Sequence, residues 1–76
     1  MSVEDVYGLN KSILTNREQE VFDLLVLNKS TKEIAEFLGI SEKTVRNHIS
    51  NTIQKLGVKG RTQAVLELIK LDLINF

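Results

Sequence analysis

The segment from Thr31 to Arg61, TKEIAEFLGISEKTVRNHISNTIQKLGVKGR, constrains the fold more strongly than any other part of this 76-residue chain. Ile34 and Leu38 share one helical face at the i, i+4 spacing, and Gly39 follows where a residue with positive φ commonly ends a helix. Ser41 then offers a side chain that can cap a second helix. Together these residues predict a helix–turn–helix, with its two helices at residues 31–38 and 42–56.

The second predicted helix has one apolar and one polar face. Its apolar face contains Val45, Ile49, the methyl group of Thr52, Ile53 and Leu56. Its polar face contains Lys43, Arg46, Asn47, Ser50 and Gln54. The spacing of each set follows the period of an α-helix, so one face is expected to pack and the other to be exposed. An exposed polar helix fits the major groove of B-DNA, where each base pair presents its own pattern of donors and acceptors.

The residue types on the polar face indicate how bases would be read. Arg46 can donate two hydrogen bonds to guanine O6 and N7, and Asn47 can pair with adenine N6 and N7. Lys43 and Ser50 are interpreted as base contacts of second rank, since either can also reach a phosphate or a bridging water. For each of these residues, an ordinary solvated surface position is the alternative interpretation.

A further set of residues is interpreted as contacting the DNA backbone. Positive side chains, polar side chains and helix N-termini bind phosphate without selecting a base. The residues of this kind in and around the helix–turn–helix are Thr31, Lys32, Thr44, Asn51, Lys55, Lys59 and Arg61. Ordinary surface solvation is again the alternative for each of them.

Charge is segregated along the chain, although the formal net charge is zero. Residues 29–61 contain seven Lys or Arg and three acidic residues, which gives +4. Residues 1–28 carry −3, and residues 62–76 carry −1. Zero net charge alone argues against binding to nucleic acid, but the positive segment coincides with the helix–turn–helix and can attract phosphate locally.

Capping boxes mark the starts of two helices. Thr15 and Glu18 form the first box, and the helix that it begins is predicted to end at about Leu27. Ser30 and Glu33 repeat the pattern directly before the first helix of the helix–turn–helix.

The last helix is predicted from about Arg61 to Leu71 or slightly beyond. The sequence contains no strand pattern, internal repeat or low-complexity stretch. The predicted fold class is therefore all-α, with four helices within residues 14–76, preceded by an N-terminal arm at residues 1–13.

This last helix carries more apolar surface than one core contact requires. One apolar stripe contains Ala64, Val65, Leu68 and Leu71. The residues predicted to form a dimer interface, on and beside the second stripe, are Leu66, Ile69, Lys70 and Leu73. A monomer could instead cover that stripe with residues 9–14 or 74–76. We favour a two-fold dimer, because pairing would support a thin core and would hold two reading helices about one DNA turn apart.

Three segments are similar to the effector domain of the LuxR family of bacterial transcription regulators. They are TNREQEVFDLL at residues 15–25, KEIAEFLGISEKTVRNHISNTIQKLGV at residues 32–58 and GRTQAV at residues 60–65. The resemblance implies a four-helix LuxR-type helix–turn–helix domain that binds promoter DNA in a sequence-specific manner. It also places the predicted phosphate contacts near the DNA backbone and implies pairing through the last helix.

Within that family, the chain resembles a stand-alone regulator of spore-coat genes. This resemblance implies activation and repression of late sporulation genes in the cytoplasm of a bacterial mother cell, by recruiting or obstructing RNA polymerase. The expected partners are therefore double-stranded promoter DNA, RNA polymerase and a second copy of the chain.

Other classes of function have less support. The chain contains no cysteine and a single histidine, so neither a metal site nor a cofactor is expected. No apolar run reaches the roughly 18 residues of a membrane span. No acid/base pair or nucleophile constellation indicates an enzyme. The remaining alternative is a helical protein-interaction module that does not bind DNA.

Two residues fit the helical pattern less clearly. His48 lies toward the inner side of the reading helix, and we interpret it as a partly buried structural residue or a donor to a flanking phosphate. Phe37 lies away from Ile34 and Leu38 on the helical wheel. We predict that it lies at the edge of the core, with a partner-binding role as the alternative.

Overall fold

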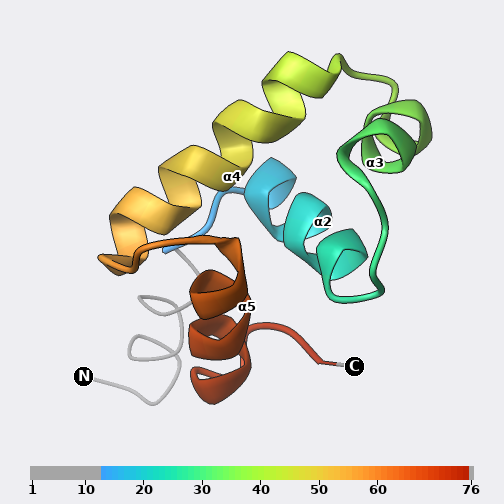
Figure 1. Cartoon of the computed structure of the whole chain (residues 1–76). Helices are drawn as coiled ribbons and strands as arrows, with labels where there is room; N and C mark the ends of the chain where they lie inside the picture. The colour runs from blue at the N-terminus through green and yellow to red at the C-terminus, as the bar shows by residue number, and fades with distance from the viewer. Residues whose placement is uncertain (1–12, 76) are drawn as a thin grey trace.

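The computed structural model describes residues 13–75, which contain helices and connecting turns but no strand. The helices, labelled in Figure 1, are α2 at Asn16–Leu25, α3 at Thr31–Leu38, α4 at Glu42–Leu56 and α5 at Arg61–Lys70. This arrangement confirms the predicted all-α fold. The predicted N-terminal arm lies outside the described residues apart from Ile13, which is half-buried and packs against the core.

Helix α4 is the central element of the fold. It contacts α2, α3 and α5, and α2 also contacts α3. In Figure 1, α4 extends along one side of the molecule, with α2 and α5 on its inner side and α3 near its N-terminal end. The outer side of α4 is not covered by any of the other described helices.

The core is formed by apolar residues from all four helices and from both flanking segments. Its buried members are Leu14, Val21, Phe22, Ile34, Ala35, Val45, Ile49, Ala64, Leu68 and Ile74. The predicted apolar face of α4 is confirmed, because Val45 and Ile49 are buried and Thr52 is fully enclosed beside them. Burying a side chain of this size contributes about 1.5–3 kcal/mol, so α4 is fixed mainly by its inner face.

Both predicted capping boxes are present. The Thr15 hydroxyl accepts from the Glu18 amide at 3.1 Å, and the Glu18 carboxylate accepts from the Thr15 amide at 2.9 Å. Ser30 and Glu33 make the same reciprocal pair at 3.1 and 2.9 Å. These bonds satisfy amides that have no partner inside the helix and thereby fix where α2 and α3 begin.

The turn between α3 and α4 is built as the sequence predicts. Gly39 has a φ of 69°, which a residue with a side chain rarely adopts. The amide of Ile40 donates to the Ala35 carbonyl at 3.0 Å, and Ser41 then caps α4 by accepting from the Thr44 amide at 3.0 Å. The left-handed residue therefore reverses the chain at once, and α4 starts three residues later, at Glu42.

Helix α2 ends earlier than predicted. The last helical residue is Leu25, whereas the sequence suggested about Leu27. The chain turns at Asn28, which has a φ of 65°, and asparagine is one of the few residues with a side chain that tolerate this conformation. Leu27 is consequently exposed.

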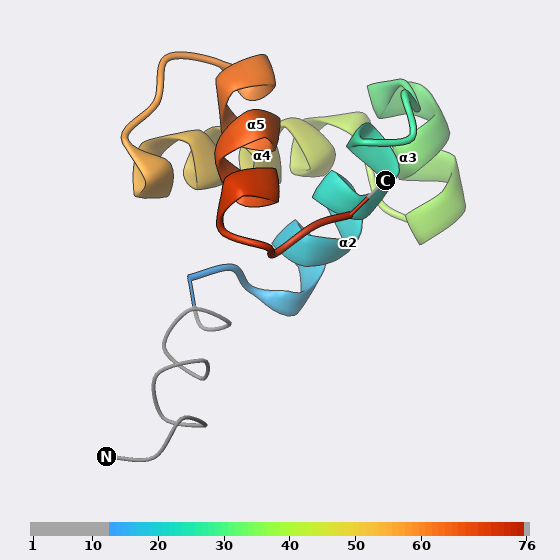
Figure 2. The same cartoon turned by 90° about the horizontal axis from the view of Figure 1, so that it is seen from below.

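The C-terminal segment folds back onto α2. Helix α5 ends at Lys70, and the chain turns at Asp72, whose φ is 60°. Leu71, which the sequence places on one apolar stripe with Ala64 and Leu68, is therefore 38% exposed, and Ile74 enters the core instead, at 2% exposure. Figure 2 shows this red segment running from α5 past α2. None of the helices formed by residues 13–75 is long and apolar enough to cross a membrane.

The predicted position of Phe37 at the edge of the core is also wrong. Its side chain is 76% exposed, although neighbouring Ile34 and Ala35 on α3 are buried. The reason is that α3 is only eight residues long and buries one narrow stripe against α2 and α4. Phe37 lies outside that stripe.

Candidate nucleic-acid interface

The four residues predicted to read bases lie together on the exposed face of α4. Lys43, Arg46, Asn47 and Ser50 are all exposed. They lie opposite the buried face of the same helix, which packs against α2, α3 and α5. The exposed side chains are thus carried by a helix whose position is set by three neighbours, as readout of base edges in the major groove requires.

A hydrogen bond within α4 lies at the border between its exposed and buried faces. The Thr52 hydroxyl donates to the His48 carbonyl at 2.9 Å, which satisfies the hydroxyl and leaves the methyl group in the core. His48 is half-buried at the same border, as predicted. Within the described residues, no group of three or more His, Asp or Glu side chains is placed to hold a metal ion.

Arg46 has a weak intramolecular partner. Its guanidinium lies 3.9 Å from the Glu42 carboxylate, and both side chains are about half exposed. An exposed pair of this kind contributes roughly 0.3–0.5 kcal/mol. Arg46 can therefore exchange Glu42 for a guanine at little energetic cost.

The predicted phosphate contacts lie near both ends of α4. Thr31 and Lys32 form the start of α3, and Thr44 lies in the first turn of α4, where its hydroxyl is 2.9 Å from that of Ser41. Beyond the other end of α4, Lys59 and Arg61 are exposed in the link to α5 and at the start of that helix. Asn51 is exposed on α4 between these two groups. Phosphates on either side of a major groove require donors in such a flanking arrangement.

Lys55 makes a contact within the protein that we did not predict from the sequence. Its ammonium donates to the Glu18 carboxylate, which is nearly fully buried at the start of α2. Burial raises the pKa of Glu18, but hydrogen bonds from Lys55 and the Thr15 amide, together with the nearby positive charge, outweigh burial and hold that pKa below its ordinary value. One carboxylate therefore caps α2 and ties it to the C-terminal half of α4.

A weak signal for this ion pair was present in the sequence. Lys55 lies next to His48 and Thr52 on the helical wheel, at the border of the buried face, whereas the predicted base contacts lie opposite. Lys55 can be paired with Glu18 only when the position of α2 against α4 is known, because 37 residues separate Lys55 from Glu18 in the sequence. The predicted phosphate contact of Lys55 remains untested, and part of its charge is already compensated within the protein.

The predicted dimer residues, which lie on α5 and in the segment after it, differ in exposure. Leu66 is 59% exposed and Lys70 is exposed, whereas Ile69 and Leu73 are half-buried against the core of their own chain. The carbonyl of Leu73 also accepts from Gln19 Nε2 at 2.8 Å. Leu73 thus belongs to the folded-back C-terminal segment, and Leu66 is the most accessible apolar member of the second stripe.

Residues 12–68 match the luxR family of bacterial regulatory proteins, and the chain belongs to this family. It is a DNA-binding regulator of transcription, a class of protein that is not an enzyme class. The spore germination protein GerE of Bacillus subtilis is 69% identical over 62 residues, which cover 82% of this chain and 84% of GerE. A solved structure of the transcription factor GerE superimposes with a TM-score of 0.81 at 65% identity and covers 83% of this chain and 94% of that one. The resemblance seen in the sequence is confirmed.

Other relatives are much longer than this chain. The transcriptional regulatory protein DegU of Brevibacillus brevis is 57% identical over 58 residues, which cover 76% of this chain but only 25% of DegU. The match to such proteins therefore concerns one domain of each.

Proposed function

We propose that the protein reads operator DNA with the exposed face of α4, with Arg46 and Asn47 making the principal base contacts. The observation that carries this proposal is the composition of α4, in which an exposed polar face lies opposite an inward face whose Val45, Ile49 and Thr52 are buried. Lys43 and Ser50 add base, phosphate or water-mediated contacts on the same face. The backbone contacts are assigned to Thr31, Lys32, Thr44, Asn51, Lys55, Lys59 and Arg61.

We further propose that two copies bind together through α5 and that the bound dimer recruits or obstructs RNA polymerase at promoters. Leu66 is the centre of the proposed contact, because it is the most exposed large apolar residue of α5. Two-fold pairing would present two α4 helices to half-sites about one DNA turn apart.

The proposed targets are late sporulation and spore-coat genes in the mother-cell cytoplasm. The support is the similarity to GerE, whose name describes a spore germination protein, over most of both chains. Complementation provides the test: expression of this protein in a Bacillus subtilis strain that lacks GerE should restore spore germination. Failure to do so, with the protein stably produced, would contradict the assignment to these genes.

DNA binding itself is tested by selecting bound sequences from random DNA and titrating the selected site with purified protein. We expect a shared sequence to emerge and to bind more tightly than unrelated DNA of the same length. Enrichment of no sequence would contradict base reading by α4 and would favour the alternative of a protein-interaction module.

A further inference from the structure

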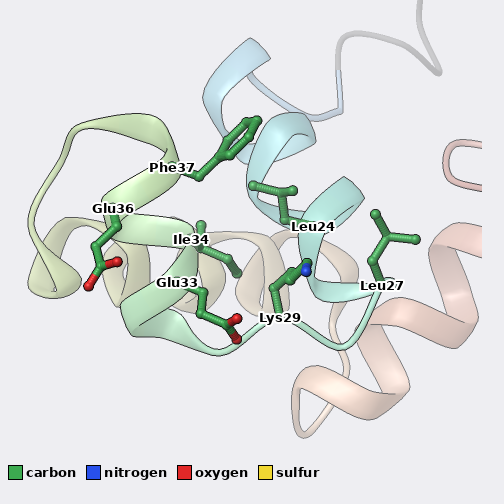
Figure 3. A pocket seen from close by; sticks show the side chains of 7 residues that line it. All are labelled: Leu24, Leu27, Lys29, Glu33, Ile34, Glu36 and Phe37. Atoms are coloured by element: carbon green, nitrogen blue, oxygen red, sulfur yellow. The ribbon is translucent and has the colours of Figure 1, made fainter.

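An apolar groove lies between α2 and α3, on a part of the molecule that the proposed DNA contacts do not use. Phe37 of α3 and Leu24 of α2 border it, together with buried Ile34 and with Leu27 in the turn after α2, as Figure 3 shows. Its volume is about 670 Å³. None of the residues that line it belongs to α4.

Phe37 is unusually exposed for a large apolar residue. It is the most exposed large apolar residue among those described, at 76%. A second, smaller hollow is also lined by Phe37 and Leu24. One exposed aromatic side chain thus borders two hollows, as a contact point for another protein commonly does.

The charges around Phe37 identify the kind of partner. Acidic residues border the two hollows at Glu20, Asp23, Glu33 and Glu36, whereas Lys29 is the one basic residue that lines either of them. Four negative charges around an apolar patch repel the DNA backbone and attract a segment with positive flanks. The groove is therefore unsuited to DNA and suited to an apolar side chain flanked by Lys or Arg.

A second copy of the chain fits this surface poorly. The basic residues of the chain are concentrated in residues 29–61, and the proposed function commits most of them to DNA. The first twelve residues carry Glu4 and Asp5 against Lys11, so their charge does not complement the acidic border either. A protein that meets this regulator at a promoter is a better candidate for the occupant of the groove.

We propose that the groove around Phe37 is the surface through which the DNA-bound protein contacts the transcription machinery. Its occupant is an amphipathic helix of RNA polymerase holoenzyme that inserts an apolar side chain beside Phe37 and places Lys or Arg against Glu33 and Glu36. This inference rests on the proposed function, because it assigns a surface to the polymerase contact proposed there. The groove and the reading face of α4 use different residues, so both can be occupied at once.

The first test separates DNA binding from stimulation of transcription. A promoter that carries the selected DNA site is transcribed in vitro with purified polymerase and either wild type, Phe37→Ser or Leu71→Ser. Leu71 is the control because it is an exposed leucine that lines neither hollow. Removing an aromatic contact point typically reduces affinity by about fivefold or more, so Phe37→Ser should need at least about fivefold more polymerase for the same transcript level while binding DNA as wild type does. Equal stimulation by Phe37→Ser and wild type would overturn the proposal.

The second test identifies the occupant directly. Phe37 is replaced by the photoreactive p-benzoylphenylalanine, and a matched protein carries it in place of Leu71. Illumination with polymerase and promoter DNA should link position 37, but not position 71, to a polymerase subunit at a segment containing Lys or Arg. A link to DNA, to a second copy or within the chain, or no link at all, would overturn the proposal.

The two proposals can fail separately. If wild type does not bind selected DNA, the proposed function fails. The crosslinking experiment is then repeated with micromolar polymerase and without DNA. A specific link from position 37 under those conditions would support the docking surface even without DNA binding. Its absence would overturn the docking surface by itself.

Discussion

Arg46 and Asn47 differ in how their side chains are held before DNA is bound. Arg46 is held loosely by Glu42, whereas no hydrogen bond is found for the Asn47 side chain within the described residues. Both are exposed and both can make a pair of hydrogen bonds with one base. Their contribution to specificity should therefore exceed their contribution to general DNA affinity.

We predict that Arg46→Ala and Asn47→Ala each weaken binding to the preferred site by about 1–3 kcal/mol and relax the preference at the contacted base pair. Competition titrations against singly substituted sites measure both effects. Asn16→Ala, an exposed asparagine at the start of α2, is the matched control and should behave as wild type. Unchanged ranking of sites in both variants would show that these residues do not read bases.

Backbone contacts have a different signature, because phosphate carries no sequence information. We predict that Lys59→Ala and Arg61→Ala weaken binding to selected and random DNA alike and reduce the slope of log K against log salt by about 0.9 each. Lys55→Ala should change this slope less, since Glu18 already compensates part of its charge. Salt titrations of the three variants measure the slopes. Slopes equal to wild type for Lys59→Ala and Arg61→Ala would remove both residues from the interface.

The ionisation of Glu18 makes the free energy of unfolding depend on pH. Its pKa is lower in the folded protein than the ordinary value of 4.5, so the folded state binds fewer protons than the unfolded state. This contribution is fully present above the ordinary pKa and is lost as the pH falls through the lower, folded value. The relevant range is therefore acidic, below about pH 5.

We predict that Glu18→Gln lowers the free energy of unfolding at pH 7 by about 1–3 kcal/mol and flattens its dependence on pH in the acidic range. Urea titrations between pH 7 and pH 3 measure this. Glu20→Gln is the control, because Glu20 is exposed and pairs only weakly with Arg17 at 3.7 Å. If Glu18→Gln and wild type lose stability in parallel on acidification, the carboxylate does not make the described contacts in solution.

At the scale of single elements, most boundaries were predictable because their signals are local. The signals at these boundaries are the capping boxes, the serine before α4 and Gly39. Each involves only three or four neighbouring residues, so it can be recognised in the sequence alone. The errors concern tertiary effects. Leu71 shares an apolar stripe with buried Ala64 and Leu68, but the reversal at Asp72 leaves it exposed. Phe37 was expected at the edge of the core despite its place on the helical wheel, and the narrow packing of α3 leaves it exposed as well.

Part of the candidate site could likewise be predicted from local sequence patterns, and part could not. The exposed polar face of α4 follows from helical periodicity, which requires no knowledge of neighbouring elements. The Lys55–Glu18 pair and the groove around Phe37 depend on where α2 lies relative to α4 and α3, and no local pattern encodes that position.

Gly39 provides a test of the turn that orients α3 against α4. A Cβ added there would meet no atom within 4 Å, so any cost of Gly39→Ala arises from its positive φ alone. We predict a loss of about 1 kcal/mol in the free energy of unfolding. Gly60→Ala is the matched control, since Gly60 also has open space and its φ of −166° is ordinary extended backbone. Thermal or urea denaturation compares them, and equal stability of the two variants would contradict a left-handed residue at position 39.

At the scale of the whole molecule, the arrangement of α5 decides whether two copies assemble. Ile69 is half-buried in its own chain, so substituting it would disturb folding as well as pairing. Leu66 is the better probe, because its exposed side chain contributes little to the monomer core.

We predict that Leu66→Glu abolishes the advantage of paired half-sites over a single half-site while leaving binding to the single half-site unchanged within about twofold. Light scattering over a concentration series and titration of both DNA forms measure these properties. The Leu71→Glu variant controls for a charge placed on an exposed leucine of the same region. A wild type that stays monomeric and shows no preference for paired half-sites would contradict the dimer.

The return of the C-terminal segment to α2 also determines when the domain can assemble during its synthesis. Gln19 is joined to the carbonyl of Leu73, 54 residues later, and Ile74 completes the core beside α2. A ribosome delivers the chain in order at about 5–20 residues per second, so Ile74 emerges after every residue of the four helices. Ile74 follows the end of α4 at Leu56 by 18 residues, so α4 leaves the ribosome about 1–4 s before the core that positions it can close. The newly made domain can thus complete its core only after the segment that contains Ile74 has emerged.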